Sequence, residues 1–141
     1  MSQKNIELVK GAYAAFGRGD LPAILDMMTE DAAIGIVGRR QDAPFFGMHT
    51  ARAGVMEFFK LLDAAHAISM FEPQRFLAAE EEVFIWGRYT WTMRGSGASA
   101  TTEWLHVITV RDGKIAAWRG HNDTAMLAAA YHAAPGGVTR G

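Results

Sequence analysis

The sequence predicts an α+β fold in which helices come first and an antiparallel sheet follows. In the first part of the chain, apolar side chains recur at helical spacing, and over residues 67–122 they follow the pattern of strands. The dipeptide Asp112-Gly113, between two of these strands, is typical of a tight two-residue hairpin. Helices followed by such a meander are expected to pack on one face of the sheet.

The composition is that of one domain with a substantial core. The chain has 141 residues, of which 50% are hydrophobic and 21% are charged, and this is close to the commonest size of a single domain. We expect one domain over residues 1–137 and a disordered tail over residues 138–141. The net charge of −1 argues against a nucleic-acid partner. The absence of cysteine excludes disulfides, thiolate metal sites and cysteine nucleophiles.

The helices can be placed from spacing and from the residues that end them. The first is expected over residues 3–16, and Gly17 and Gly19 stop it because glycine adopts the left-handed conformation of many helix ends. Asp20 can cap a second, short helix, which tolerates Pro22 in its first turn.

The rest of the chain alternates loop, helix and strands. An irregular loop is expected over residues 38–48, followed by a third helix that starts near Thr50. A last helix is expected to begin at Asp123, a natural cap, and to end at Pro135. The strand candidates cover residues 33–37, 67–78, 83–94, 101–111 and 114–122.

The long strand over residues 83–94 is apolar on both of its sides. One side carries five large apolar residues and the other carries Phe84 and Trp86. A strand buried on both faces needs a partner on each of them. We therefore expect helices and a cavity on the concave face of the sheet, and a second copy of the chain on the convex face.

Several short motifs resemble one superfamily over residues 3–130. They are Tyr13 to Asp20 in the first helix, Phe46-Gly47, Trp104 to Val107, Asp112 to Ile115, and Trp118-Arg119. Together they resemble the nuclear-transport-factor-two-like superfamily, which includes ketosteroid isomerases, limonene epoxide hydrolases and SnoaL-like polyketide cyclases. The resemblance implies a cone-shaped domain, a cystatin-like roll, whose strongly curved antiparallel sheet is wrapped by N-terminal helices around an apolar pocket. It also implies a homodimer and no cofactor or metal.

The catalytic positions of these relatives hold other residues here. The isomerases' tyrosine and two aspartates fall at Ala12, Ile36 and Leu105. If Arg88 is aligned with the arginine of the epoxide hydrolases, their aspartates fall at Thr90 and Gly120, and the cyclases' acid–base aspartate also falls at Gly120. The known chemistries are therefore not inherited in their known form.

The resemblance nevertheless indicates a set of pocket residues. If the direction of each strand's side chains follows the relatives, Trp118, Gly120 and Asn122 face inward, with Arg88, Thr90, Glu103 and Leu105 on neighbouring strands. The expected ligand pocket is lined by Tyr13, Phe16, Ile36, Phe59, Thr90, Leu105, Trp118, Gly120 and Asn122.

Three residues are candidates for catalysis: His121, Arg88 and Glu103. Histidine titrates near neutrality, and His121 could reach the pocket if Gly120 allows a bulge, whereas His106 is expected to face outward. Arg88 and Glu103 could form either a pocket pair that orients a substrate or a structural salt bridge. Asp123 could lie at the pocket mouth or simply cap the last helix.

The sequence leaves three functions open. The first is a small-molecule pocket protein of the SnoaL-like type, acting as a cofactor-independent isomerase, cyclase or hydro-lyase on a cyclic or polyketide-like substrate. The alternatives are a non-catalytic binder of an apolar metabolite, or an association module that uses the convex sheet face. No apolar run approaches the roughly 20 residues of a membrane span, so we expect a cytoplasmic protein with no membrane partner.

Overall fold

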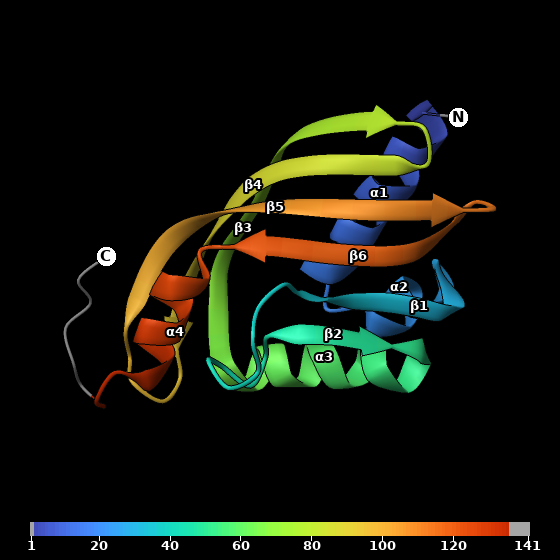
Figure 1. Cartoon of the computed structure of the whole chain (residues 1–141). Helices are drawn as coiled ribbons and strands as arrows, with labels where there is room; N and C mark the ends of the chain where they lie inside the picture. Colours follow the sequence, from blue (N-terminus) through green and yellow to red (C-terminus); the bar gives the residue numbers. More distant parts are fainter. Residues whose placement is uncertain (1, 136–141) are drawn as a thin grey trace.

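Four helices and one six-stranded sheet make up the computed structural model, which describes residues 2–135 (Figure 1). The helices are α1 (Ser2–Gly17), α2 (Leu21–Asp26), α3 (Ala51–Ala65) and α4 (Thr124–His132). The strands are β1 (Met28–Ile36), β2 (Gly47–Thr50), β3 (His66–Ala79), β4 (Glu82–Met93), β5 (Ser99–Arg111) and β6 (Lys114–Asn122). The α+β class with N-terminal helices is confirmed, and the expected tail over residues 138–141 lies outside the described residues.

The strands are ordered β2-β1-β6-β5-β4-β3, and the sheet is not closed into a barrel. Neighbouring strands are antiparallel except β1 and β6, which run parallel. The long β3–β4–β5–β6 meander was expected from the sequence. The parallel pair was not, because β1 joins the sheet only through a strand that the chain forms some eighty residues later.

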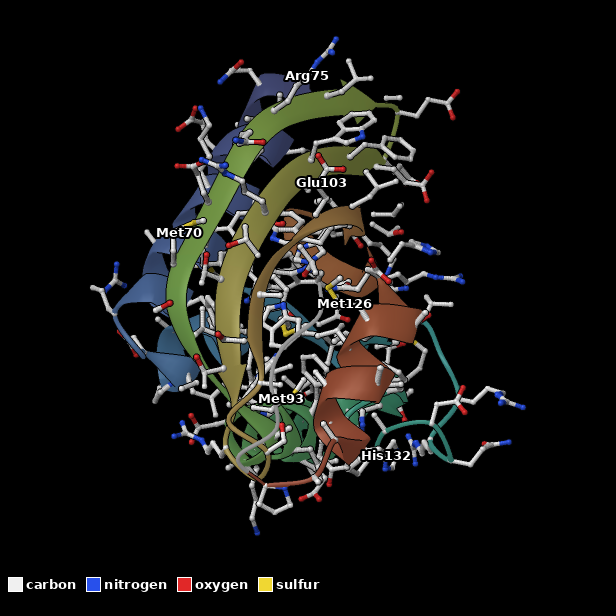
Figure 2. All side chains as sticks on the ribbon, turned by 90° about the vertical axis from the view of Figure 1, so that its left-hand side faces the viewer. Met70, Arg75, Met93, Glu103, Met126 and His132 are labelled. Atoms are coloured by element: carbon white, nitrogen blue, oxygen red, sulfur yellow. The ribbon has the colours of Figure 1, made fainter. Side chains whose placement is uncertain are left out.

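The sheet bends strongly, and its bend has local causes. The pairing of β3 with β4 shifts register twice, between Ile68 and Met70 and between Pro73 and Arg75. Such bulges bend a strand, and proline is tolerated there because β3 is an edge strand. Figure 2 shows β3 and β4 curving along their length, with α4 to their right.

The predicted helix caps and the predicted hairpin turn are present in the structure. The Asp20 carboxylate accepts the Ala23 backbone N–H, and that of Asp123 accepts the Met126 N–H. The helix-capping alternative for Asp123 is therefore confirmed. Asp112 and Gly113 have φ values of 52° and 78°, the left-handed conformation that a two-residue type I′ hairpin requires.

Two strands differ from the sequence prediction. Strand β1 begins at Met28, five residues before the predicted start, and β2 begins inside the predicted loop over 38–48. Strand β2 has only four residues, too few to show a periodic pattern, and it forms by pairing with residues 33–35 of β1. Among the helices that the structure describes, none is long and apolar enough to cross a membrane.

Candidate functional site

A small apolar cavity lies between the sheet and the helices α1 and α3. Its volume is about 60 Å³. All strands except β2 contribute to it, and most of its walls are aromatic or aliphatic. It is lined by Tyr13, Phe16, Ile34, Gly35, Ile36, Phe58, Phe59, Leu62, Ile68, Phe71, Tyr89, Trp104, His106, Trp118, Gly120 and Asn122. None of these residues carries a carboxylate, a lysine ammonium or an arginine guanidinium.

A larger open cleft of about 1110 Å³ adjoins this cavity. The two spaces share six lining residues, which we call the throat: Tyr13, Phe16, Phe59, Leu62, Ile68 and Phe71. Charged residues appear only on the cleft side of the throat and include Glu57, Lys60, Asp63 and Arg94. The route from solvent therefore passes from a charged rim, between aromatic side chains, to an uncharged interior.

His106, on β5, is the one histidine that lines the cavity. Its ring stacks on Trp104 with centroids 4.0 Å apart. Its Nδ1 lies 2.7 Å from the Tyr13 hydroxyl oxygen and 3.0 Å from Trp118 Nε1. Burial, with a smaller contribution from the charge of His121, lowers the pKa of His106 to about 3, so the imidazole is neutral at physiological pH.

The partners of His106 fix its tautomer. An indole N–H can only donate, so Nδ1 must accept the bond from Trp118 and carry no proton. The Tyr13 hydroxyl donates to the same nitrogen, and burial raises the pKa of Tyr13 well above its usual value. The proton of the neutral ring is therefore on Nε2, which makes no hydrogen bond to any residue within 2–135.

A second set of hydrogen-bonded polar groups extends from the end of α3 to the cavity. His66 is fully buried, and its Nδ1 lies 3.0 Å from the Leu62 carbonyl oxygen. Its Nε2 lies 3.1 Å from the Tyr89 hydroxyl. Burial lowers the pKa of His66 and raises that of Tyr89, and a hydrogen bond from Asn122 offsets part of the second effect.

Two buried polar atoms at the cavity have no hydrogen-bond partner within the described part of the chain. They are Trp104 Nε1, a donor, and Asn122 Oδ1, an acceptor. An unpaired buried polar group costs about 1–3 kcal/mol, and such groups are unusual in folded proteins. The cavity thus offers both a donor and an acceptor to a bound molecule.

Two glycines make room for this arrangement. A Cβ atom on Gly87 would lie 2.3 Å from Trp104 Cζ2, so glycine is required where the indole crosses β4. A Cβ on Gly120 would lie 3.3 Å from Asn122 Oδ1 and 3.5 Å from His106 Nε2. Gly120 therefore leaves free the space between these two polar atoms, and we call it the floor of the cavity.

Seven of the nine predicted pocket residues line the cavity. They are Tyr13, Phe16, Ile36, Phe59, Trp118, Gly120 and Asn122. The inward direction expected for the other two, Thr90 and Leu105, is wrong. In β4 the odd-numbered residues are buried, and in β5 every buried residue is even-numbered, so both side chains lie on the outer face.

The three catalytic candidates also lie away from the cavity. Arg88 and Glu103 face each other across β4 and β5 on the outer face, and both are exposed. Arg88 forms its ion pair with Glu72, at 2.9 Å, and this contact lowers the pKa of the Glu72 carboxyl. His121 is exposed, because β5 and β6 pair without a register shift around Gly120.

The outward direction expected for His106 is wrong as well. The signal that could have found it was in β4, whose odd-numbered side carries all five of Val83, Ile85, Tyr89, Trp91 and Met93. Residues directly opposite in an antiparallel pair share a face. Tyr89 is opposite Thr102, so the inner residues of β5 are the even-numbered ones, including Trp104 and His106. Across residues 2–135, no cluster of His, Asp or Glu side chains is arranged to hold a metal ion.

Comparison with known proteins agrees with this geometry. The sequence matches the family model of the SnoaL-like domain over residues 9–118. An NTF2-like protein from Burkholderia xenovorans is 31% identical, with 94% of this chain and 98% of that chain covered and a TM-score of 0.84. TerC, co-crystallised with polyporic acid, is 24% identical over 92% and 99% of the two chains, with a TM-score of 0.79. A Xanthomonas campestris protein described as a candidate polyketide cyclase is 19% identical over 92% and 98%, with a TM-score of 0.74. No curated protein matches the sequence.

Proposed function

Because the chain belongs to the SnoaL-like domain family, we propose that it binds a cyclic, polyketide-like small molecule in the cavity between α1, α3 and the sheet. The observation that carries the proposal is the pair of unpaired polar atoms, Trp104 Nε1 and Asn122 Oδ1, at an otherwise apolar and aromatic cavity. Apolar pockets with a few convergent polar groups are the usual form of a small-molecule site.

The size of the space indicates how the ligand lies. A cavity of about 60 Å³ is smaller than the roughly 150 Å³ of a cavity that holds benzene. A ring compound therefore places only its polar end inside. Its body lies in the throat, between Phe16, Phe59 and Phe71, and its far end reaches the open cleft. Flat aromatic walls favour a flat ligand.

The uncharged interior favours a neutral ligand. With no ionised side chain among the lining residues, a charged group inside would lose its hydration without gaining a counter-charge. His106 adds no charge either, because its pKa of about 3 keeps the ring neutral. Carbonyl and hydroxyl groups suit this site, since both hydrogen bond without charge.

Binding is better supported than turnover. His106 could donate from Nε2 to a ligand carbonyl and stabilise an enolate, as neutral imidazoles do in other enzymes. Proton removal would need a base, and no carboxylate lines the cavity. An isomerase or cyclase activity would therefore depend on a proton acceptor supplied by the ligand itself or by water.

Calorimetric titration with 1-naphthol, a ring compound with one hydroxyl group that is neutral at pH 7, tests the proposal. We expect it to bind. Gly120→Ala adds a methyl group 3.3 Å from Asn122 Oδ1 and should weaken that binding. Gly95→Ala is the matched control, because its new methyl meets nothing within 4 Å. Binding that is equal in both variants would place the ligand elsewhere.

A homodimer is proposed on separate grounds. Leu77 and Trp86 are 49% and 44% exposed on the outer face of β3 and β4. With Phe84, Leu105 and Val107 beside them in the sheet, they form an apolar outer-face cluster. Burying such a cluster against a second copy would remove its apolar surface from water. Light scattering of the wild type measures the mass directly, and a monomer at all concentrations would refute this proposal.

A further inference from the structure

A chain of hydrogen bonds runs from the backbone of α3 to the cavity floor. Contacts of 3.0 and 3.1 Å link the Leu62 carbonyl, His66 and the Tyr89 hydroxyl. Asn122 hydrogen bonds to that hydroxyl and thereby offsets part of the rise in the Tyr89 pKa. Of the three side chains in this series, Tyr89 and Asn122 line the cavity and His66 does not. The chain therefore connects a rigid helix end to the one amide that faces the ligand space.

Each bond in this chain has a single allowed direction. A carbonyl oxygen only accepts, so His66 Nδ1 carries the proton and donates to Leu62. His66 Nε2 is then the acceptor, and the Tyr89 hydroxyl must donate to it. The Tyr89 oxygen is left as an acceptor, which Asn122 can satisfy only with its Nδ2–H group.

The direction of the chain fixes the orientation of the Asn122 amide. With Nδ2 turned toward Tyr89, the carbonyl oxygen Oδ1 is presented to the cavity, where it is buried and has no partner within residues 2–135. A rotated amide would place two acceptors, Oδ1 and the Tyr89 oxygen, against each other. The relay thus keeps an acceptor, and not a donor, at the cavity floor.

The floor has room for one ligand group beside this acceptor. The Cβ position that Gly120 leaves empty is 3.3 Å from Asn122 Oδ1 and 3.5 Å from His106 Nε2. The tautomer of His106 makes its Nε2 a donor. A hydroxyl group above Gly120 could donate to Oδ1 while accepting from Nε2. An ether oxygen in the same place could only accept, and would leave Oδ1 unpaired.

We propose that His66 and Tyr89 are positioning residues that make the cavity selective for ligands with a neutral hydroxyl group, a phenol or an enol, over the same ligands without one. This inference rests on the proposed binding function and names its ligand class. Asn122 is the residue that contacts the ligand, and His66 and Tyr89 act through it. Sites built to pair a ligand hydroxyl discriminate strongly against analogues that lack it.

The test compares 1-naphthol with 1-methoxynaphthalene, which differ only at the hydroxyl. We expect wild-type protein to bind 1-naphthol about tenfold more tightly, the effect of one hydrogen bond to an otherwise unpaired buried atom. Tyr89→Phe removes the hydroxyl that holds Asn122. It should reduce the preference to about twofold or less, mainly by weakening 1-naphthol and leaving 1-methoxynaphthalene unchanged.

Two further variants separate positioning from stability. Asn122→Leu removes the acceptor and should abolish the preference. Tyr131→Phe makes the same chemical change as Tyr89→Phe in α4, outside the cavity lining, and should keep the full preference. A general loss of packing would weaken both ligands equally, so the ratio of the two affinities reports the relay alone.

Each outcome decides something different. If neither compound binds wild-type protein, the proposed function and this inference both fall. If both bind equally, binding stands and the selectivity is refuted. If wild type prefers 1-naphthol and Tyr89→Phe keeps that preference, the relay does not orient Asn122. Should Tyr89→Phe fail to fold, Asn122→Leu and the wild-type ratio still decide the ligand class.

Discussion

Replacing Gly87 by alanine tests the packing that holds the site together. The new Cβ would lie 2.3 Å from Cζ2 and 2.6 Å from Cη2 of Trp104, and 2.6 Å from the Glu72 carbonyl oxygen. Carbon atoms pack at about 3.5–4.0 Å, so the indole must retreat by roughly 1 Å. The Trp104 ring stacks on His106 at a centroid distance of 4.0 Å and on Phe71 at 4.9 Å. A shift of the indole would therefore displace these two residues of the cavity wall.

The expected cost follows from this overlap. Overpacking a well-filled core costs about 1–3 kcal/mol. For a domain of this size, 1 kcal/mol corresponds to a change in Tm of about 4 °C, so Gly87→Ala should melt about 4–12 °C below wild type. Thermal unfolding followed by circular dichroism measures the shift, and the ligand that binds wild type should bind the variant more weakly.

Gly95 provides the matched control for this prediction. It is exposed, and a Cβ there meets nothing within 4 Å, so Gly95→Ala should change stability by no more than about 0.5 kcal/mol. If Gly87→Ala melted within 2 °C of wild type while keeping its ligand affinity, the close contact between β4 and Trp104 would not exist as described.

The remaining predictions concern titration, tautomers, capping and association. His106 has a pKa of about 3 when folded against an ordinary value of 6.5, so below pH 6.5 the unfolded chain binds more protons. The contribution of this residue to stability is therefore complete at pH 7, and the free energy of unfolding falls toward pH 3 by up to about 1.4 kcal/mol per pH unit. Urea denaturation at a series of pH values should show that the free energy of unfolding falls less steeply with decreasing pH in His106→Gln than in wild type. Nitrogen-15 NMR should find the proton on Nε2 of His106 and on Nδ1 of His66, and the reverse in either ring would contradict the network. Asp123→Ala should lose about 1 kcal/mol by removing the cap of α4, measured by thermal unfolding, and an unchanged Tm would deny the cap. If wild type is a dimer, Trp86→Lys should shift it toward monomer, which light scattering would detect as a lower average mass. A dimer unaffected by the substitution would show that the outer-face cluster is not its interface.

Much of the fold could be read from local pattern. Helix ends followed from the caps Asp20 and Asp123, and the hairpin at Asp112 followed from the conformations its two residues favour. The resemblance to the nuclear-transport-factor-two-like superfamily is confirmed by the SnoaL-like family match and by the shared architecture. These features depend on residues close together in sequence, or on short motifs that can each be recognised in the sequence.

The site depended on which face of each strand is buried. Strand β5 carries large apolar residues on both sides, with Trp104 inward and Leu105 outward, so its own pattern does not choose a face. Taking the direction of the side chains from relatives exchanged the inner and outer faces of β4 and β5. The predicted directions of Arg88, Glu103 and His106 were wrong for this reason. The register between β4 and β5 resolves the choice, because the five buried residues of β4 then determine the inner face of its neighbour.

The polar network was beyond local pattern for a different reason. Tyr13 and His106 are 93 positions apart, and His66 and Tyr89 are 23 apart. Nothing in either neighbourhood signals that the partner exists. The tautomers, and therefore the donors and acceptors offered to a ligand, follow only when these side chains are brought together by the sheet.

The central claim is that a small ring compound binds with its polar end on the Gly120 floor. A nitrogen-15 NMR titration with 1-naphthol tests it most directly, because the indole N–H signals of Trp104 and Trp118 report from the cavity wall and that of Trp86 from the outer face. We predict that the first two signals shift with increasing ligand while the third stays fixed. A titration that moves only Trp86, or none of the three, would contradict the account.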